Sequence, residues 1–307
     1  RHFRIIASTQ VTQQINANGI KIVWGYFSPG TLGLFIANIV SIASRIIRLA
    51  MGEIKKLLSK ENRPSWTDIK HSAIRYKRFP LIDSWSGLLN SASVQLPVVL
   101  FTALFSPAVA GYYSLSHRLL SLPMSLIGNS VANVFLERAA KAKDNDEELG
   151  RITLELYKKL ILIGSVIMSF VTFYGDKLFP LIFGEQWAEA GKYAQWISVW
   201  LIFVLAASPL SNVYTVKERQ VESLVFNIIV FLSRTIAIVF PFKIWYSAMA
   251  SVVFFALTGM LVWIILAIRI LGIAGISFVR SILITICYPL FIFGGQYLIS
   301  LFIREII

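Results

Sequence analysis

The sequence predicts an all-α integral membrane protein whose helices cross the bilayer several times. Hydrophobic residues make up 56% of its 307 residues and charged residues only 15%, whereas charged residues make up about 25% of a typical soluble domain. The mean hydropathy is +0.70. The apolar residues fall in long runs between short charged segments, and each run can cross a hydrocarbon core of about 30 Å as a helix. We therefore predict a polytopic helical membrane protein.

The excess of basic residues fits this class. The chain has 29 Lys and Arg against 16 Asp and Glu, a formal net charge of +13. These charges lie between the apolar runs, where they set topology and meet anionic headgroups. We therefore expect membrane lipids as partners and no nucleic acid.

The chain opens with two apolar runs, at about 5–26 and 32–49. The first carries Gln10, Gln14, Asn18 and Lys21, which share one helical face. Lys21 lies toward the outer end of this run, where it serves either as an interfacial anchor or as a cavity residue. We assign residues 1–52 to the last two transmembrane helices of an N-terminal bundle, and residues 53–78, the longest hydrophilic stretch, to a cytoplasmic basic linker.

Residues 79–138 form a hairpin of two apolar runs, about 25 residues each, that meet at Ser106-Pro107. Both runs carry polar residues at helical spacing, namely Asp83, Ser86, Asn90 and Ser93 in the first and Arg118, Ser121, Ser125, Asn129 and Asn133 in the second. Unpaired polar groups cost several kcal/mol in lipid. We therefore expect both polar faces to line a polar cavity. Pro97, Pro123 and Pro209 interrupt helices, as static kinks or as hinges.

The rest of the chain completes the second bundle. We assign residues 79–241 to its core and 242–307 to additional transmembrane helices, giving about nine spans in all. The segment 137–159 is charged, and the next span starts at about 160. Lys and Arg concentrate at 55–78, 138–159, 217–219 and 269–280. These loops are therefore predicted to be cytoplasmic. An odd number of spans would place the C-terminus outside, so either a further helix is missing or one of the runs does not cross, and both alternatives stay open.

Charges within the spans are the strongest candidate functional residues, because each is costly unless it is paired or hydrated. Arg234 lies in the middle of its run and must face the bundle, either binding an anion or pairing with a carboxylate. Arg118 lies deep in its run, and a cavity role is favoured over a structural salt bridge. Asp83 lies near the inner end of its run, as a solvated or a functional residue.

The sequence shows no pattern typical of an enzyme. It contains neither a nucleophile elbow nor a phosphate-binding loop. The three His residues and Cys287 lack the spacing of metal ligands, and a lone Cys offers no disulfide. We expect no catalytic, metal or cofactor-binding residues and no cofactor.

One known family matches an ordered set of short motifs. These are Phe79-Pro80-Leu81, Leu88-Leu89-Asn90, Leu96-Pro97, Gly111-Tyr112-Tyr113, Leu122-Pro123, Gly128-Asn129, Phe183-Gly184, Ser208-Pro209-Leu210-Ser211 and Glu218-Arg219-Gln220. Their order resembles the Wzx-type polysaccharide and O-antigen flippases of the multidrug/oligosaccharidyl-lipid/polysaccharide exporter superfamily. The resemblance covers about residues 1–220. It implies two helical bundles around a polar cavity, with the first bundle incomplete because about four preceding spans are missing.

The resemblance also implies a function. Such a protein moves undecaprenyl-pyrophosphate-linked oligosaccharide repeat units across the bacterial inner (cytoplasmic) membrane by alternating access. Coupling to H+ or Na+ is expected, with polymerase and glycosyltransferase machinery as partners. The candidate residues of the substrate path are Gln14, Lys21, Asp83, Asn90, Arg118, Ser125, Asn129 and Arg234.

Three alternatives stay open at this point. A multidrug or cation antiporter of the same superfamily would need deep acidic residues, and Asp83 is the one candidate. A membrane polysaccharide polymerase would normally have a large outer loop, whereas the loops predicted outside are short. A purely structural membrane scaffold is the third.

Overall fold

The computed structural model describes residues 18–24, 31–57, 65–76 and 84–306, together with residues 15, 26 and 82. Every element within these residues is helical. The chain separates into two compact units, residues 1–77 and 78–307. Seven of the described helical segments are long and apolar enough to cross a membrane. The predicted all-α, polytopic membrane fold is confirmed.

The first unit contains α2 (Thr31–Leu57) and α3 (Trp66–Tyr76). The apolar run predicted at 32–49 thus forms a helix that continues into the basic segment. In α3, Asp68 accepts a hydrogen bond from the Ser65 backbone N–H at 3.1 Å, and Ser65 Oγ accepts one from the Thr67 N–H at 3.4 Å. This local capping stabilises a helix inside the segment predicted as the linker.

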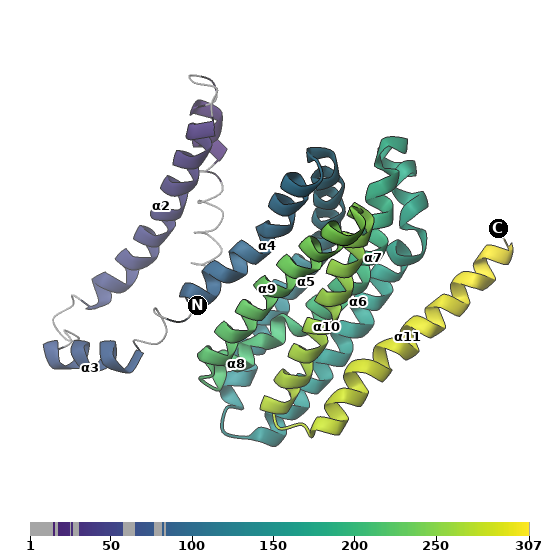
Figure 1. The fold of residues 1–307 in the computed structure, drawn as a ribbon. Coiled ribbons are helices and arrows are strands. Elements are labelled where there is room, and N and C mark those ends of the chain that lie inside the picture. The colour runs from purple at the N-terminus through teal and green to yellow at the C-terminus, as the bar shows by residue number, and fades with distance from the viewer. Residues whose placement is uncertain are drawn as a thin grey trace. The chain divides into compact units, whose positions relative to one another are not determined.

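The second unit is an antiparallel helical bundle (Figure 1). Its helices are α4 (Ser84–Leu104), α5 (Pro107–Lys141), α6 (Asp146–Phe183), α7 (Ala188–Ala207), α8 (Asn212–Val216), α9 (Gln220–Trp245), α10 (Ala248–Ile273) and α11 (Phe278–Ile306), with 3₁₀ turns at Glu185–Trp187 and Pro209–Ser211. Helix α7 packs against α5, α6 and α10; α9 packs against α4 and α10; and α11 packs against α6 and α10.

The core of this bundle is centred on α7. In the span that contains α7, 67% of the residues of its 18-residue apolar stretch are buried, against 17–39% of such residues in the other six spans. Small residues let its neighbours approach closely. A Cβ on Gly191 would collide with the backbone of Gly175 in α6. From α5, the Ser116 hydroxyl donates a hydrogen bond to the Ala190 carbonyl at 2.6 Å.

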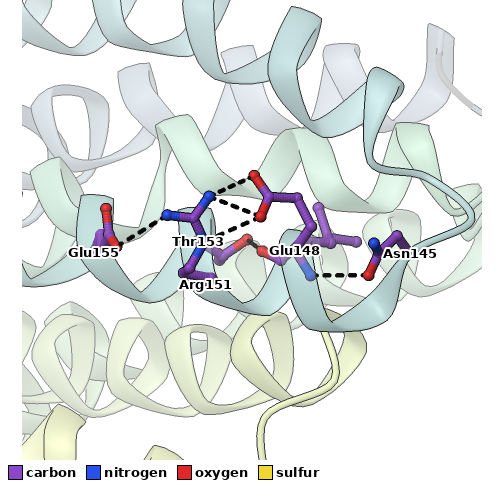
Figure 2. A network of polar contacts seen from close by, with 6 residues as sticks. Asn145, Glu148, Arg151, Thr153 and Glu155 are labelled. Carbon is purple, nitrogen blue, oxygen red and sulfur yellow. Dashed lines mark hydrogen bonds and ion pairs between the residues drawn. The ribbon is translucent and has the colours of Figure 1, made fainter.

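The charged segment at 137–159 is helical over most of its length, and the helix that carries the next apolar run begins well before residue 160. Helix α5 ends at Lys141 and α6 begins at Asp146. Asn145 caps α6, because its Oδ1 accepts a hydrogen bond from the Glu148 N–H at 3.0 Å. Arg151 then pairs with Glu148 at 2.7 Å and Glu155 at 3.7 Å (Figure 2). A capped start and i,i+3 and i,i+4 ion pairs make this polar sequence a good helix former.

Pro209 behaves differently from Pro97 and Pro123. Pro97 and Pro123 lie inside the continuous helices α4 and α5. Pro209 follows the end of α7 and opens a 3₁₀ turn that leads into α8. A helical break of the kind predicted is therefore found at Pro209.

Candidate functional site

Arg234 is buried in the second unit, with a relative exposure of 9%. Helix α9 turns Arg234 inward together with Val230, Ala237 and Pro241, which are also buried. Ile228, Leu232 and Ile236 lie exposed on the other side of α9. The helix thus separates a lipid-compatible face from a face that carries one guanidinium into the bundle.

The guanidinium of Arg234 donates to a backbone carbonyl that a proline leaves without its helical donor. Nη1 donates to the Ser93 carbonyl of α4 at 2.7 Å. In an uninterrupted helix that carbonyl would accept from the N–H of residue 97, but Pro97 has none. Arg234 therefore satisfies a backbone acceptor that would otherwise be left unpaired within the membrane.

Aromatic rings surround the same guanidinium. Its Cζ lies 5.4 Å from the ring centre of Trp200 on α7 and 5.9 Å from that of Phe255 on α10. Desolvated cation–π contacts of this kind stabilise by about 2 kcal/mol. Gly259 leaves room for the indole, since a Cβ there would lie 2.8 Å from Trp200 Nε1. His117 stacks on Trp200 at a centroid distance of 5.9 Å, so it is a packed member of this cluster.

Arg234 keeps unused hydrogen-bonding capacity. A guanidinium has five N–H donors, and among the described residues Arg234 forms one hydrogen bond, to Ser93, and no ion pair. Two neighbouring buried atoms, Ser93 Oγ and Trp200 Nε1, also lack a partner in this part of the chain. The site therefore holds surplus donors, as an anion site requires.

A polar cavity of about 220 Å³ opens beside Arg234. It is lined by α4, α9, α10 and the segment around α8, and its polar lining residues are Ser86, Asn90, Ser208, Ser211, Tyr214, Ser223, Asn227 and Arg234. The Asn227 amide donates to Ser86 Oγ at 2.6 Å, linking α9 to α4. The lining contains no carboxylate. Hydroxyls, amides and one guanidinium suit a phosphate or a sugar better than a cation.

The size of the cavity limits what it can hold. Pockets for complete small ligands measure about 300–1,000 Å³, and this one is smaller. It therefore fits one polar group of a larger ligand.

The structure brings two of the predicted site residues together. Asn90 and Arg234 line the same cavity. Arg118, Ser125 and Asn129 lie exposed on α5 and are not part of its lining, and the Ser125 hydroxyl donates to the Leu122 carbonyl within its own helix at 2.9 Å. Lys21 lies in the first unit and is half-buried. Gln14 and Asp83 lie outside the described residues. The predicted substrate path through these residues stays a prediction.

Two lining residues that the sequence interpretation missed could have been found. On α9, Ser223, Asn227, Val230 and Arg234 follow one another at steps of three or four residues, so all four share one face. The contributions of Ser208 and Ser211 depend on how α7 ends, which the sequence pattern does not specify. No cluster of three or more His, Cys, Asp or Glu residues that could hold a metal occurs within the described ranges.

Fold and site together define a multi-pass helical membrane protein with a polar, cationic cavity in its larger unit. The family model described as "Polysaccharide biosynthesis protein" matches residues 1–192. The chain belongs to this family. It is therefore a membrane protein of polysaccharide biosynthesis.

One curated relative agrees with the family. The capsular polysaccharide biosynthesis protein CapF of Staphylococcus aureus is 27% identical over 161 residues, which are 48% of this chain and 39% of that protein. The match thus spans about two fifths of the relative's length. No solved structure matches this chain.

Proposed function

We propose that the protein is a flippase that moves a polyprenyl-pyrophosphate-linked oligosaccharide from the cytoplasmic to the outer leaflet of the bacterial cytoplasmic membrane by alternating access. The observation that carries the proposal is the buried Arg234, which faces a cavity of hydroxyls and amides with no carboxylate in its lining. Coupling to H+ or Na+, and delivery of the product to a polymerase, belong to the same proposal.

The position of the cavity fits loading from the cytoplasm. Its lining residues Ser211 and Ser223 flank the basic turn at 217–219, which the Lys and Arg distribution predicts to be cytoplasmic. A phosphate entering from this side would meet the hydroxyls and amides first and the guanidinium last. The lipid chain can stay in the bilayer throughout.

Arg234 also gives the proposed site a means of responding to the ligand. While it donates to the Ser93 carbonyl, it supports α4 at the point where Pro97 removes a helical hydrogen bond. A phosphate oxygen competes for the same donors and binds them more strongly, because both partners are then charged. Binding would thereby release α4 to bend at Pro97.

The same lining argues against export of a cationic drug. A cationic substrate would need an acidic residue in the cavity, and the lining offers none. Its one charge, Arg234, would repel such a substrate.

The test is complementation of a strain that lacks its flippase, using full-length protein and a blot for membrane abundance. Arg234→Ala should reduce surface polysaccharide about tenfold or more per protein molecule, as expected when a charged hydrogen bond to substrate is lost. Arg234→Lys should retain part of the export, because it keeps the charge without the guanidinium fork. Lys243→Ala, at an exposed position on the same helix, should leave export unchanged. Normal export by Arg234→Ala would remove Arg234 from the site.

A further inference from the structure

A second cavity, unrelated to the one beside Arg234, lies between α5 and α6. It measures about 340 Å³. Helices α5 and α6 are consecutive, and both pack against α7, so a groove is left between their outer faces. The floor of the groove is Phe135, with an exposure of 2%.

The walls of this groove are apolar. They are formed by Val131 and Val134 of α5 and by Ile152 and Leu156 of α6. Val134 is 52% exposed, so the groove is open on this side. An open apolar groove on a membrane helix pair accommodates a hydrocarbon chain, since the chain fills volume that lipid packing would otherwise leave void.

The rim of the groove is positively charged. Arg138 and Lys159 line it, and neither forms an ion pair with any described residue. The one carboxylate in the lining, Glu155, is turned toward Arg151 at 3.7 Å (Figure 2). Two cations are therefore free to receive an anion beside an apolar channel.

The pattern of charged and apolar residues predicts that the groove lies at the level of the headgroups. Lys159 is the last charged residue before the apolar stretch 160–173 of α6, and Arg138 lies in the last turn of α5. Both belong to the segment whose Lys and Arg content predicts the cytoplasmic side. The apolar walls and the cations thus meet where hydrocarbon gives way to headgroups.

We propose that this groove binds an anionic glycerophospholipid of the cytoplasmic leaflet. One acyl chain lies against Val131, Val134 and Leu156, and the phosphate lies between Arg138 and Lys159. Charge complementarity selects an anionic lipid over a zwitterionic one. The bound lipid bridges α5 and α6 along the groove between them.

The experiment is native mass spectrometry of the purified full chain with equal amounts of phosphatidylglycerol and phosphatidylcholine. The wild type should retain phosphatidylglycerol preferentially. Combining Arg138→Gln with Lys159→Gln should reduce its retention about tenfold, because two surface cations are lost. Val134→Trp should reduce retention of both lipids by filling the groove.

Matched controls separate the groove from general lipid affinity. Lys141→Gln removes an exposed cation of the same helix that already pairs with Glu137 at 2.7 Å. Leu126→Trp enlarges a 73% exposed residue of α5 outside the groove. Both should retain lipid as the wild type does, and all variants should keep their lipid-free melting temperature.

Three outcomes would overturn the proposal. Equal retention of the two phospholipids by the wild type would remove the anionic preference. An equal loss of lipid retention in the two control variants would show that any surface cation or any exposed side chain of α5 affects lipid binding, and not the groove in particular. Displacement of phosphatidylglycerol by undecaprenyl phosphate at equal concentration would assign the groove to a different lipid.

Discussion

At the scale of single residues, the contact between Arg234 and Ser93 joins two features that look separate in the sequence. A proline in α4 removes a backbone donor, and an arginine in α9 supplies one at 2.7 Å. Either feature alone would be unfavourable in a membrane, because an unpaired carbonyl and an unpaired cation are both costly there. Together they satisfy each other and leave further donors for a ligand.

This contact predicts a non-additive pair of substitutions. Arg234→Ala leaves the Ser93 carbonyl unpaired and should lower the free energy of unfolding by about 1–3 kcal/mol. Pro97→Ala restores the N–H that this carbonyl lacks, so the double variant should regain most of that loss. Thermal unfolding of the four proteins in detergent, analysed as a double-mutant cycle, measures the coupling.

Export measured on the same four proteins separates stability from ligand binding. The double variant should be stable yet still unable to export, because the restored helical hydrogen bond does not replace the cation. Export that recovers along with stability would mean that Arg234 acts on the helix alone.

The sequence allowed part of this site to be predicted. A charge in mid-span had to face the bundle, and Arg234 does. Its partner could not be predicted, because it is a backbone carbonyl on another helix and depends on how α4 and α9 pack. For the polar residues of α5, the sequence predicts which residues share a face but not what they contact. Their periodicity placed Arg118 and Asn129 on one face, but periodicity does not say what that face meets.

At the scale of helices, α7 fits its position because its residues are small where neighbours cross it. A Cβ on Gly191 would meet the backbone of Gly175, which cannot rotate away as a side chain can. Gly191→Ala should therefore separate α6 from α7 and cost about 1–3 kcal/mol of the free energy of unfolding, as overpacking does. Melting of the purified protein measures the effect.

The matched control for this prediction is Gly272→Ala in α10, where a Cβ would have nothing within 4 Å. That change should be neutral or slightly stabilising, because alanine favours the helix by about 1 kcal/mol over glycine. If both variants melt alike, the close approach of α6 and α7 contributes nothing to stability.

Helix boundaries show where sequence patterns mislead. Apolar runs located the spans of the second unit, but the apolar run that starts near residue 160 belongs to a helix that already begins at Asp146. The charged first turns are helical because Asn145 caps them and Arg151 bridges two glutamates (Figure 2). Hydropathy detects the membrane boundary of a helix and not its end.

At the scale of the whole molecule, the charge asymmetry of the loops predicts which ends of the helices face the cytoplasm. In a Cys287→Ser background, cysteine introduced at exposed Ser72 of α3 should resist an impermeant thiol reagent in intact cells. Cysteine introduced at Gln186, in the turn before α7, should react readily. The physical reason is that Lys- and Arg-rich segments are retained on the inner side of the membrane. Labelling in the reverse pattern would contradict the predicted orientation.

Composition and runs of apolar residues were enough to predict an all-α membrane protein, because the bilayer permits few other solutions. The total of about nine spans stays a prediction, since the first run falls largely outside the described residues and α2, which holds the second run, is not among the seven candidate spans. The arrangement of the two bundles depends on contacts between helices that hydropathy does not encode.

The burial of α7 also has a consequence for how the chain is made. Trp200 of α7 packs against Phe255 of α10 as a T-shaped pair with a centroid distance of 5.0 Å. Helices α8 and α9 lie between α7 and α10 in the chain. During synthesis α7 therefore enters the bilayer before its enclosing partner exists. The face of its indole that Phe255 covers stays open until α10 arrives, and the cation site forms only when α9 brings Arg234. Closure of the cavity is thus a late step in the biogenesis of the second bundle.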